Sequence, residues 1–290
     1  MSDLDNIYEI EGFKMHLDPK KRGISADLLV HGSREPAFMW ILRKEAKGDL
    51  GVDIGANIGY ATLNLCKSMN NVIAIEPDQR CRKLLKRSLR DNDFEDKTIV
   101  YGSAISDIIG EKEIYLAKNN FNLNSLCDVS ATLSKKDKFI KKTIKTITLD
   151  SMDIDPNFIK MDIEGYEVEA LRGAKNTLRR AKNCKILIEV HPQYYDDKRA
   201  FDIELRDIIS YGFKIKYLVS AGVSCPDLFK EKGYEPFKTF KAGEHTRGIF
   251  TDVSQEDAIN FSSFVHKQIN PETRRVSSKI VRSIFLVKGE

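Results

Sequence analysis

Residues 52–66, VDIGANIGYATLNLC, place an acid directly before a glycine-rich turn. Asp53 ends a short apolar run, and Gly55 and Gly59 then allow a sharp turn from a strand into a helix. A dinucleotide site uses a similar turn, but its G-x-G-x-x-G pattern has a glycine where this chain has Asn57. A carboxylate here would repel a pyrophosphate and attract a cation. At about 4 Å and intermediate dielectric, that attraction is on the order of 4 kcal/mol before desolvation.

S-adenosylmethionine (SAM) fits this pattern, because it carries an ammonium and a sulfonium and no phosphate. Glu76 ends the next strand, in AIEPD. A carboxylate there can accept hydrogen bonds from both ribose hydroxyls of a nucleoside. SAM and NAD share this ribose, so Glu76 predicts a nucleoside site without choosing between them. Helix capping or turn chemistry is the alternative role for both Asp53 and Glu76.

Two later strand ends carry the residues that could act on a second substrate. FIKMDIEG ends in Asp162 and Glu164, which point to the same side if the strand continues. Asp162 is the first candidate for organising a methyl acceptor, whereas Glu164 could equally cap the helix that begins at Tyr166. ILIEVHP ends in Glu189 and His191, which share a face by the period of two. His191 is a candidate base, because its ordinary pKa of ~6.5 lies near working pH.

These four candidate catalytic residues could also hold a divalent ion, and the pattern does not fix the number of ligands. A divalent metal therefore stays an open alternative that we do not predict. If the acceptor is a hydroxyl, alignment with the methyl group can supply ~7–11 kcal/mol of the barrier. A base typically adds ~10²–10⁴-fold.

The elements that must position these residues alternate between strand and helix patterns from residue 50 to residue 211. This alternation indicates an α/β fold with a doubly wound, mostly parallel sheet, in which ligands bind at the C-terminal strand ends. We divide the chain into an N-terminal strand and helix extension (1–47), a main domain (48–253) and a C-terminal tail (254–290).

Several stretches together resemble the FkbM-type family of SAM-dependent methyltransferases. They run in family order from residue 52 to 192, and REP at 34–36 resembles the family's entry segment. The matching text is VDIGANIGYAT, VIAIEPD, YGSAISD, ITLDSM, FIKMDIEGYEVEALRGA and ILIEVHP. The resemblance says little about residues 1–30, 118–142 and 220–290, of which 118–142 and the tail are expected to shape the acceptor pocket.

The resemblance implies a Rossmann-like class I methyltransferase fold, with a mostly parallel seven-stranded sheet in the order 3-2-1-4-5-7-6 and helices on both faces. It also implies methylation of a hydroxyl oxygen on a sugar, glycolipid or other small molecule. The predicted SAM contacts are Asp53, Gly55, Ala56, Asn57, Gly59, Glu76, Ser103 and Ala104, the last two near the adenine.

Three other functions were weighed. A methyltransferase acting on RNA or another nucleic acid is the main alternative, but a base-methylating enzyme would carry a Pro-Pro motif where this chain has DIEG. A SAM-fold module without activity is disfavoured by the intact acids and glycine loop. A dinucleotide oxidoreductase is disfavoured by Asp53 and the missing middle glycine.

Composition points to a globular protein in a reducing compartment. The 290 residues carry a net charge of +4, which is too mild to argue for nucleic acid, and five scattered cysteines without a CxxC pair. The N-terminus lacks the pattern of a secretory signal, and no apolar run is long enough to span a membrane. We therefore predict a cytoplasmic protein. In the tail, clustered apolar residues mixed with Arg and Lys favour packing on the domain or in a homodimer over contact with a membrane surface.

Overall fold

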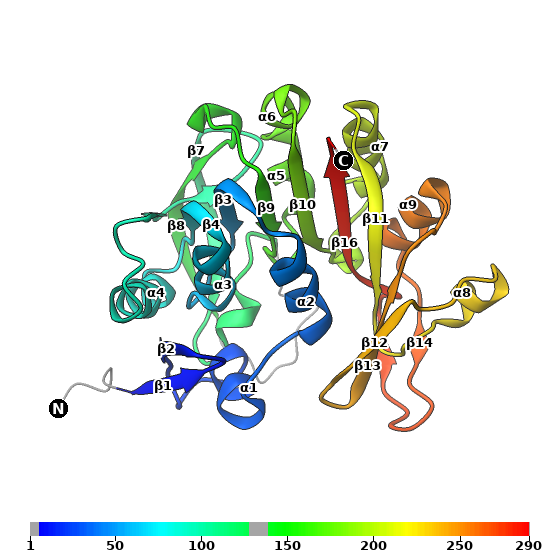
Figure 1. The fold of residues 1–290 in the computed structure, drawn as a ribbon, viewed down its shortest axis with the longest axis horizontal. Helices are drawn as coiled ribbons and strands as arrows, with labels where there is room; N and C mark the ends of the chain where they lie inside the picture. The colour runs from blue at the N-terminus through cyan, green and yellow to red at the C-terminus, as the bar shows by residue number, and fades with distance from the viewer. Residues whose placement is uncertain (1–5, 128–138, 290) are drawn as a thin grey trace.

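The computed structural model of the chain describes residues 6–127 and 139–289. Within these residues, a nine-stranded mixed sheet runs through the molecule in the order β12-β13-β11-β16-β10-β9-β3-β4-β5 (Figure 1). Its strands are β3 (Gly48–Ile54), β4 (Met69–Ile75), β5 (Thr98–Tyr101), β9 (Phe158–Met161), β10 (Cys184–Glu189), β11 (Lys214–Ser220), β12 (Lys238–Ala242), β13 (His245–Phe250) and β16 (Val281–Lys288). The prediction of a seven-stranded sheet is wrong in the number of strands, because the β12–β13 hairpin adds two strands beyond β11.

The remaining strands follow the order that the family resemblance implied. Strands β5, β4, β3, β9 and β10 are parallel neighbours. Strand β16 lies between β10 and β11 and is antiparallel to both. When the strands of this part are numbered along the chain, their order across the sheet is 3-2-1-4-5-7-6.

The C-terminal tail supplies β16, which is an interior strand of the main sheet. Ile284 and Leu286 pack in the core on one face of the sheet, and Phe285 and Val287 pack in the core on the other. A strand that is covered on both faces is a nearly continuous apolar run, which explains why this segment shows no helical stripe. The tail also contains α9 (Gln255–Ser263) and the short pair β14 (Gln268–Ile269) and β15 (Val276–Ser277).

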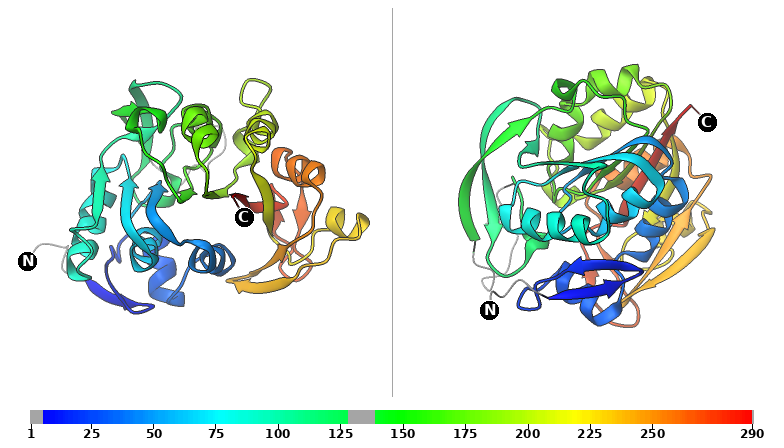
Figure 2. Two further views of the ribbon diagram at one scale, coloured as in Figure 1. Left: turned by 45° about the horizontal axis from the view of Figure 1, so that its top comes forward. Right: turned by 60° about the vertical axis from the view of Figure 1, so that its left-hand side comes forward.

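Helices cover both faces of the sheet, as expected (Figure 2). The core on one face includes α2 (Pro36–Glu45), α3 (Tyr60–Ser68) and α4 (Gln79–Asp91). The core on the other face includes α5 (Glu167–Arg172), α6 (Lys175–Arg180), α7 (Phe201–Ser210), α8 (Asp227–Glu231) and α9. None of the helices in the described ranges has the length and apolar character needed to cross a lipid bilayer.

Two further small sheets accompany the main sheet. Strands β1 (Ile7–Ile10) and β2 (Phe13–His16) form a hairpin, and the backbone N–H of His16 donates to Ser88 Oγ of α4 at 2.9 Å. Helix α1 (Ile24–His31) then leads to α2. A three-stranded sheet contains β6 (Ala104–Ile105), β8 (Phe139–Ile147) and β7 (Gly110–Ala117).

Candidate active site

A cavity of about 1060 Å³, including space open to solvent, lies at the C-terminal ends of β3, β4 and β9. This is where a doubly wound sheet binds its ligands. The wall includes these predicted residues: Gly55, Ala56, Asn57, Glu76, Ala104, Asp162, Glu164 and Glu189. Four others are not part of the wall that the described residues form: Asp53, Gly59, Ser103 and His191. The expected pocket segment also contributes, through Phe121, Asn122, Asn124, Ser125 and Leu126. Residues 128–138 of that segment lie outside the described chain.

The glycine turn brings β3 and β9 into direct backbone contact. Gly55 has φ +82°, and a Cβ there would lie 2.0 Å from the carbonyl oxygen of Asp162. Only glycine allows this approach. Asn57 follows with φ +49°, and its backbone N–H donates to Glu76 Oε2 at 2.8 Å. The Oδ1 atom of Asn57 is buried with no hydrogen-bond partner in the described chain, so it can accept a hydrogen bond from a ligand.

Asp53 differs from its expected role as the carboxylate that meets a cationic ligand. It is fully buried, and its partners are Lys160 Nζ at 2.9 Å and Thr62 Oγ1 at 2.6 Å. Lys160 also donates to the carbonyl oxygen of Gly55 at 2.7 Å. Burial opposes the charge of Lys160, but the attraction of Asp53 and Asp162 raises its pKa above the ordinary value. Asp53 therefore supports the turn through Lys160, which is itself part of the cavity wall.

Glu76 combines turn chemistry with a place in the wall. Its Oε1 atom accepts a hydrogen bond from the backbone N–H of Asp78 at 2.7 Å, and Oε2 accepts from Asn57. Burial raises the pKa of Glu76 to about 7, although the two N–H groups favour the charged form. The geometry is therefore compatible with a contact between Glu76 and the ribose hydroxyls, and also with a structural role in which Glu76 only stabilises the turn.

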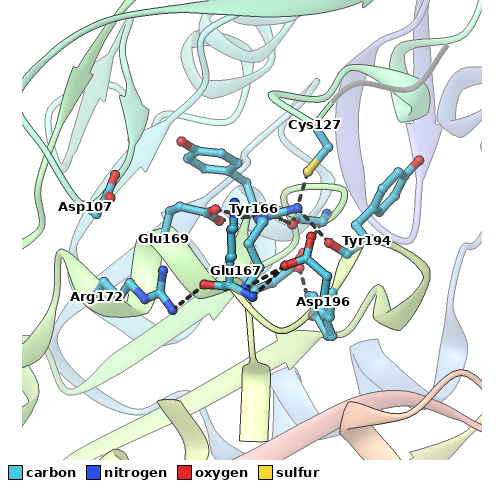
Figure 3. A network of polar contacts seen from close by, with 12 residues as sticks. Asp107, Cys127, Tyr166, Glu167, Glu169, Arg172, Tyr194 and Asp196 are labelled. Carbon is cyan, nitrogen blue, oxygen red and sulfur yellow. Dashed lines mark hydrogen bonds and ion pairs between the residues drawn. The ribbon is translucent and has the colours of Figure 1, made fainter. Parts of the chain in front are cut away.

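Asp162 and Glu164 follow β9 on an unusual turn. Glu164 has φ +50° and Gly165 φ +99°, both in the left-handed region. Ser125 Oγ donates to the carbonyl oxygen of Glu164 at 2.7 Å. The thiol of Cys127, which is labelled in Figure 3, donates to the carbonyl oxygen of Gly165 at 3.2 Å. Helix α5 has no side-chain cap, and the N–H of Gly165 donates to Glu167 at 3.0 Å, so Glu164 does not cap that helix. Its side chain faces the cavity instead.

The carboxyl groups of Asp162 and Glu164 both have raised pKa values. Burial raises the pKa of Glu164 to about 7. Burial and the nearby Glu189 also raise the pKa of Asp162. The Oδ1 atom of Asp162 is buried and has no hydrogen-bond partner in the ranges 6–127 and 139–289. The pair therefore offers an acceptor atom on Asp162 and a carboxyl group of raised pKa on Glu164 at the cavity wall.

His191 differs from the expected base. It is 2% exposed, its Nδ1 lies 2.9 Å from Glu167 Oε1, and its Nε2 lies 3.2 Å from Glu189 and 3.4 Å from Glu164. Burial and Lys279 oppose its positive charge, but Glu164 and Glu167 outweigh them and raise the pKa of His191 to about 10. Carboxylates therefore lie within ion-pair distance of both ring nitrogens, which favours the charged form of His191 and holds those carboxylates in place.

Sequence reasoning missed the residues that join the tail to the cavity. Arg282 of β16 contacts Glu189 Oε1 at 2.6 Å and Glu35 Oε1 at 3.0 Å, and both acids line the cavity. Although Glu189 is buried, Arg282 and Lys279 lower its pKa well below the ordinary value. Arg282 could not be found from local pattern alone, because its place depends on the pairing of β16 with β10.

A divalent ion stays an open alternative for this cluster. One ligand atom from each of Asp162, Glu164 and His191 lies within 4.8 Å of the others, which is close enough to share an ion. However, Glu189 already has Arg282 at 2.6 Å and Lys279 at 3.6 Å. These cations balance part of the acidic charge without a metal.

Comparison with known proteins identifies the family. The model of the methyltransferase FkbM domain matches residues 53–215. The chain is also similar to the hexuronic acid methyltransferase AglP of Haloferax volcanii, with 28% identity over 159 residues. This match covers 52% of the present chain and 59% of AglP, so the chain spans about three fifths of the length of that relative.

Two solved structures are similar to the chain at low identity. The methyltransferase FkbM from Methylobacillus flagellatus is 24% identical, with a TM-score of 0.42 over 59% of this chain and 40% of that one. TYW2 of Pyrococcus horikoshii in complex with MeSAdo is 16% identical, with a TM-score of 0.46 over 100% of this chain and 73% of that one. Because the family model covers more than half of the sequence, the protein belongs to the methyltransferase FkbM domain family.

Proposed function

We propose that the protein is a SAM-dependent methyltransferase that methylates a hydroxyl oxygen of a sugar or a related small molecule. The observation that carries this proposal is the acidic wall of the cavity beside the glycine turn. Among the residues that the structure describes, five acids line it, against two cations, Arg34 and Lys160. The acids are Glu35, Glu76, Asp162, Glu164 and Glu189. Such a wall favours a cationic nucleoside and disfavours the phosphates of a nucleic acid. The sugar class is suggested by the similarity to AglP.

An unsatisfied acceptor atom supports the fit of SAM. Asn57 belongs to the wall, and its Oδ1 atom lacks a partner in the described chain. SAM offers donors of the required kind in its ammonium and its ribose hydroxyls. Glu76 would hold the ribose hydroxyls, and the turn from Gly55 to Asn57 would hold the amino-acid part.

The chain's own residues would then orient the acceptor and remove its proton. When bound, SAM supplies an electrophilic methyl group on a sulfonium. Asp162 would accept a hydrogen bond from the acceptor hydroxyl, and a carboxylate oxygen of Glu164 would receive its proton. A base works best when its pKa lies near the operating pH, and Glu164 meets this condition. His191 and Arg282 would keep the surrounding carboxylates in place.

The cofactor assignment predicts that the protein binds S-adenosylhomocysteine (SAH) and that Glu76→Gln weakens this binding. Loss of charge-assisted hydrogen bonds to the ribose should reduce affinity roughly ten- to a hundredfold. Titration calorimetry measures the effect directly. Glu95→Gln is a matched control, because Glu95 is an exposed acid outside the cavity. Equal affinities of the Glu76→Gln and control variants would contradict the role of Glu76.

The same measurement should depend on pH. Ribose hydroxyls donate to the ionised carboxylate, so SAH binding lowers the pKa of Glu76 from its value of about 7. Affinity should therefore rise as pH increases, by roughly tenfold between pH 6 and pH 8. Glu76→Gln should flatten this rise, and any slope that persists in that variant belongs to another group.

The base assignment predicts that Glu164→Gln cuts methyl transfer and spares cofactor binding. Removing a general base should lower turnover by roughly 10²–10⁴-fold. Transfer of labelled methyl groups from SAM to a cell extract measures turnover, and calorimetry with SAH should show affinity within a few fold of the wild type. Asp155→Asn is the control, because Asp155 is exposed in the loop before β9. Undiminished transfer in the Glu164→Gln variant would remove Glu164 from the mechanism.

A further inference from the structure

A second groove lies between α2 and the β12–β13 hairpin, and we call it the hairpin groove. Its lining includes Ser33, Pro36, Trp40, Lys44 and Phe240, and its volume is about 750 Å³ including space open to solvent. It shares two wall residues, Met39 and Tyr60, with the cavity described above. The groove is therefore adjacent to the site proposed for SAM, within the size range of small-molecule pockets.

Aromatic rings and cations meet in and beside this groove. Its lining includes Arg43 and the acid Glu11, which pair with each other. Phe237 and Lys238 lie next to Trp40 but are not part of the lining. The ring centroids of Trp40 and Phe240 are 6.1 Å apart, and Phe237 lies 6.0 Å from Trp40. Lys44 Nζ and Lys238 Nζ lie 4.6 Å and 5.1 Å from the Trp40 ring. Aromatic faces of this kind pack against the apolar C–H faces of a sugar ring, and the surrounding cations favour a sugar that carries negative charge.

Arg247 is the most unusual cation of this region. It is 8% exposed, and its Nε is buried without a hydrogen-bond partner in the described residues. The ion pair of Arg247 with Glu35 is long, at 3.7 Å, and the same Glu35 oxygen is already contacted by Arg282 at 3.0 Å. A buried N–H without a hydrogen bond is costly, because it has lost its hydration without replacement. Since two guanidinium groups share one Glu35 oxygen, an anionic acceptor would suit Arg247.

The register of the hairpin places Arg247 beside the groove. Arg247 lies directly opposite Phe240 in the β12–β13 ladder, so both side chains leave the same face of the hairpin. Strand β13 pairs with β11 only through Ile249 and Phe250, so its earlier residues extend past the C-terminal end of β11. Arg247 therefore lies between Phe240 of the groove and Glu35 of the cavity wall.

We propose that the hairpin groove binds the ring of a carboxylate-bearing sugar, the methyl acceptor, and that Arg247 receives its carboxylate. This inference rests on the proposed function and narrows its acceptor to the sugar acids. A guanidinium can hold a carboxylate through two parallel hydrogen bonds, which supply both affinity and orientation. Trp40 and Phe240 bind the ring itself, without regard to its charge.

The test compares uronic acids with the neutral hexoses of the same stereochemistry. Glucuronate, galacturonate and mannuronate are titrated into the full-length protein saturated with SAH, beside glucose, galactose and mannose. At least one acid should bind more tightly than its hexose, and Arg247→Gln should reduce this preference by about tenfold or more. Lys241→Gln is the matched control, because it removes an exposed cation of the same hairpin and should leave the preference unchanged.

Phe240→Ala provides the second variant. This change should weaken the binding of uronic acids and hexoses equally, because it removes packing against the sugar ring and no charge. The ratio of the two affinities should therefore stay unchanged. Melting temperatures check that all variants are folded. If the wild-type protein binds SAH but has the same affinity for each uronic acid as for the corresponding hexose, the sugar-acid assignment is overturned. The methyltransferase proposal is left intact by that result. Failure to bind SAH would instead count against the proposed function itself.

The carboxylate could also come from the cofactor, and a further titration separates the two sources. SAH carries a carboxylate, whereas 5′-methylthioadenosine lacks the amino-acid part. If Arg247 serves the acceptor, Arg247→Gln should leave the ratio of the two affinities unchanged. A collapse of that ratio in the variant would show that Arg247 holds the cofactor, which overturns the proposal.

Discussion

Replacing Lys160 by methionine should lower the free energy of unfolding by about 3–5 kcal/mol. The change removes the ammonium that lies 2.9 Å from Asp53 and leaves that carboxylate fully buried with only the Thr62 hydroxyl as a partner. An uncompensated charge in a low-dielectric interior is one of the few causes of such a large loss. Urea denaturation followed by circular dichroism measures it.

A double variant separates the lost ion pair from lost packing. Asp53→Asn combined with Lys160→Met removes both charges and should recover much of the stability, because a neutral pair carries no charge to desolvate. Lys214→Met is the surface control, since Lys214 is exposed on β11, and it should change stability by less than about 0.5 kcal/mol. If Lys160→Met alone stays within about 1 kcal/mol of the wild type, Asp53 is not the buried, lysine-dependent carboxylate described above.

A chain that ends before Val281 should show no cooperative unfolding transition. It lacks β16, so β10 and β11 each lose the strand between them. It also loses Ile284, Phe285 and Leu286, all fully buried. Truncating one such residue to alanine costs about 2–5 kcal/mol, and whole domains have only about 5–15 kcal/mol of stability. Thermal melting and near-ultraviolet circular dichroism report the loss of fixed packing.

A chain that ends at Lys288 is the control for this truncation. It lacks only the last two residues and keeps every pair of the β10–β16 ladder, so it should melt cooperatively near the wild-type temperature. Phe285→Ala gives an intermediate case, with an expected loss of about 3–5 kcal/mol. A cooperative melt of the shorter chain would mean that β10 and β11 are stable without a strand between them.

The local sequence pattern was sufficient to predict those site residues that lie together in one segment of the chain. The glycine turn from Gly55 to Gly59, Glu76 at the end of β4 and the acids after β9 could all be read from strand and turn signals, and most of them line one cavity. Lys160 is also marked in the sequence, as a charged residue within an apolar strand. It is the only charged residue of the buried strand FIKM, and such a residue needs a partner.

The features of the site that could not be predicted from the sequence depend on contacts between distant segments of the chain. His191 was expected to titrate near neutral pH, but Glu164 and Glu167 surround it, and the spacing of residues along the chain does not reveal that enclosure. Arg282 reaches Glu189 because Ser283 pairs with Glu189 in the ladder. The choice of β16 as the partner of β10 joins residues about a hundred positions apart, and such pairing is not encoded in any local periodicity.

The central place of β16 also bears on how the protein is made. The ribosome completes β10 and β11 well before it reaches residues 281–288, so these two strands first emerge without the neighbour that separates them in the finished sheet. Each then presents an open row of backbone donors and acceptors, which is a template for pairing with another nascent chain. Arg282 arrives with the same strand, so Glu35 and Glu189 gain their shared cation only when the sheet closes. Assembly of the site is thereby tied to completion of translation through β16.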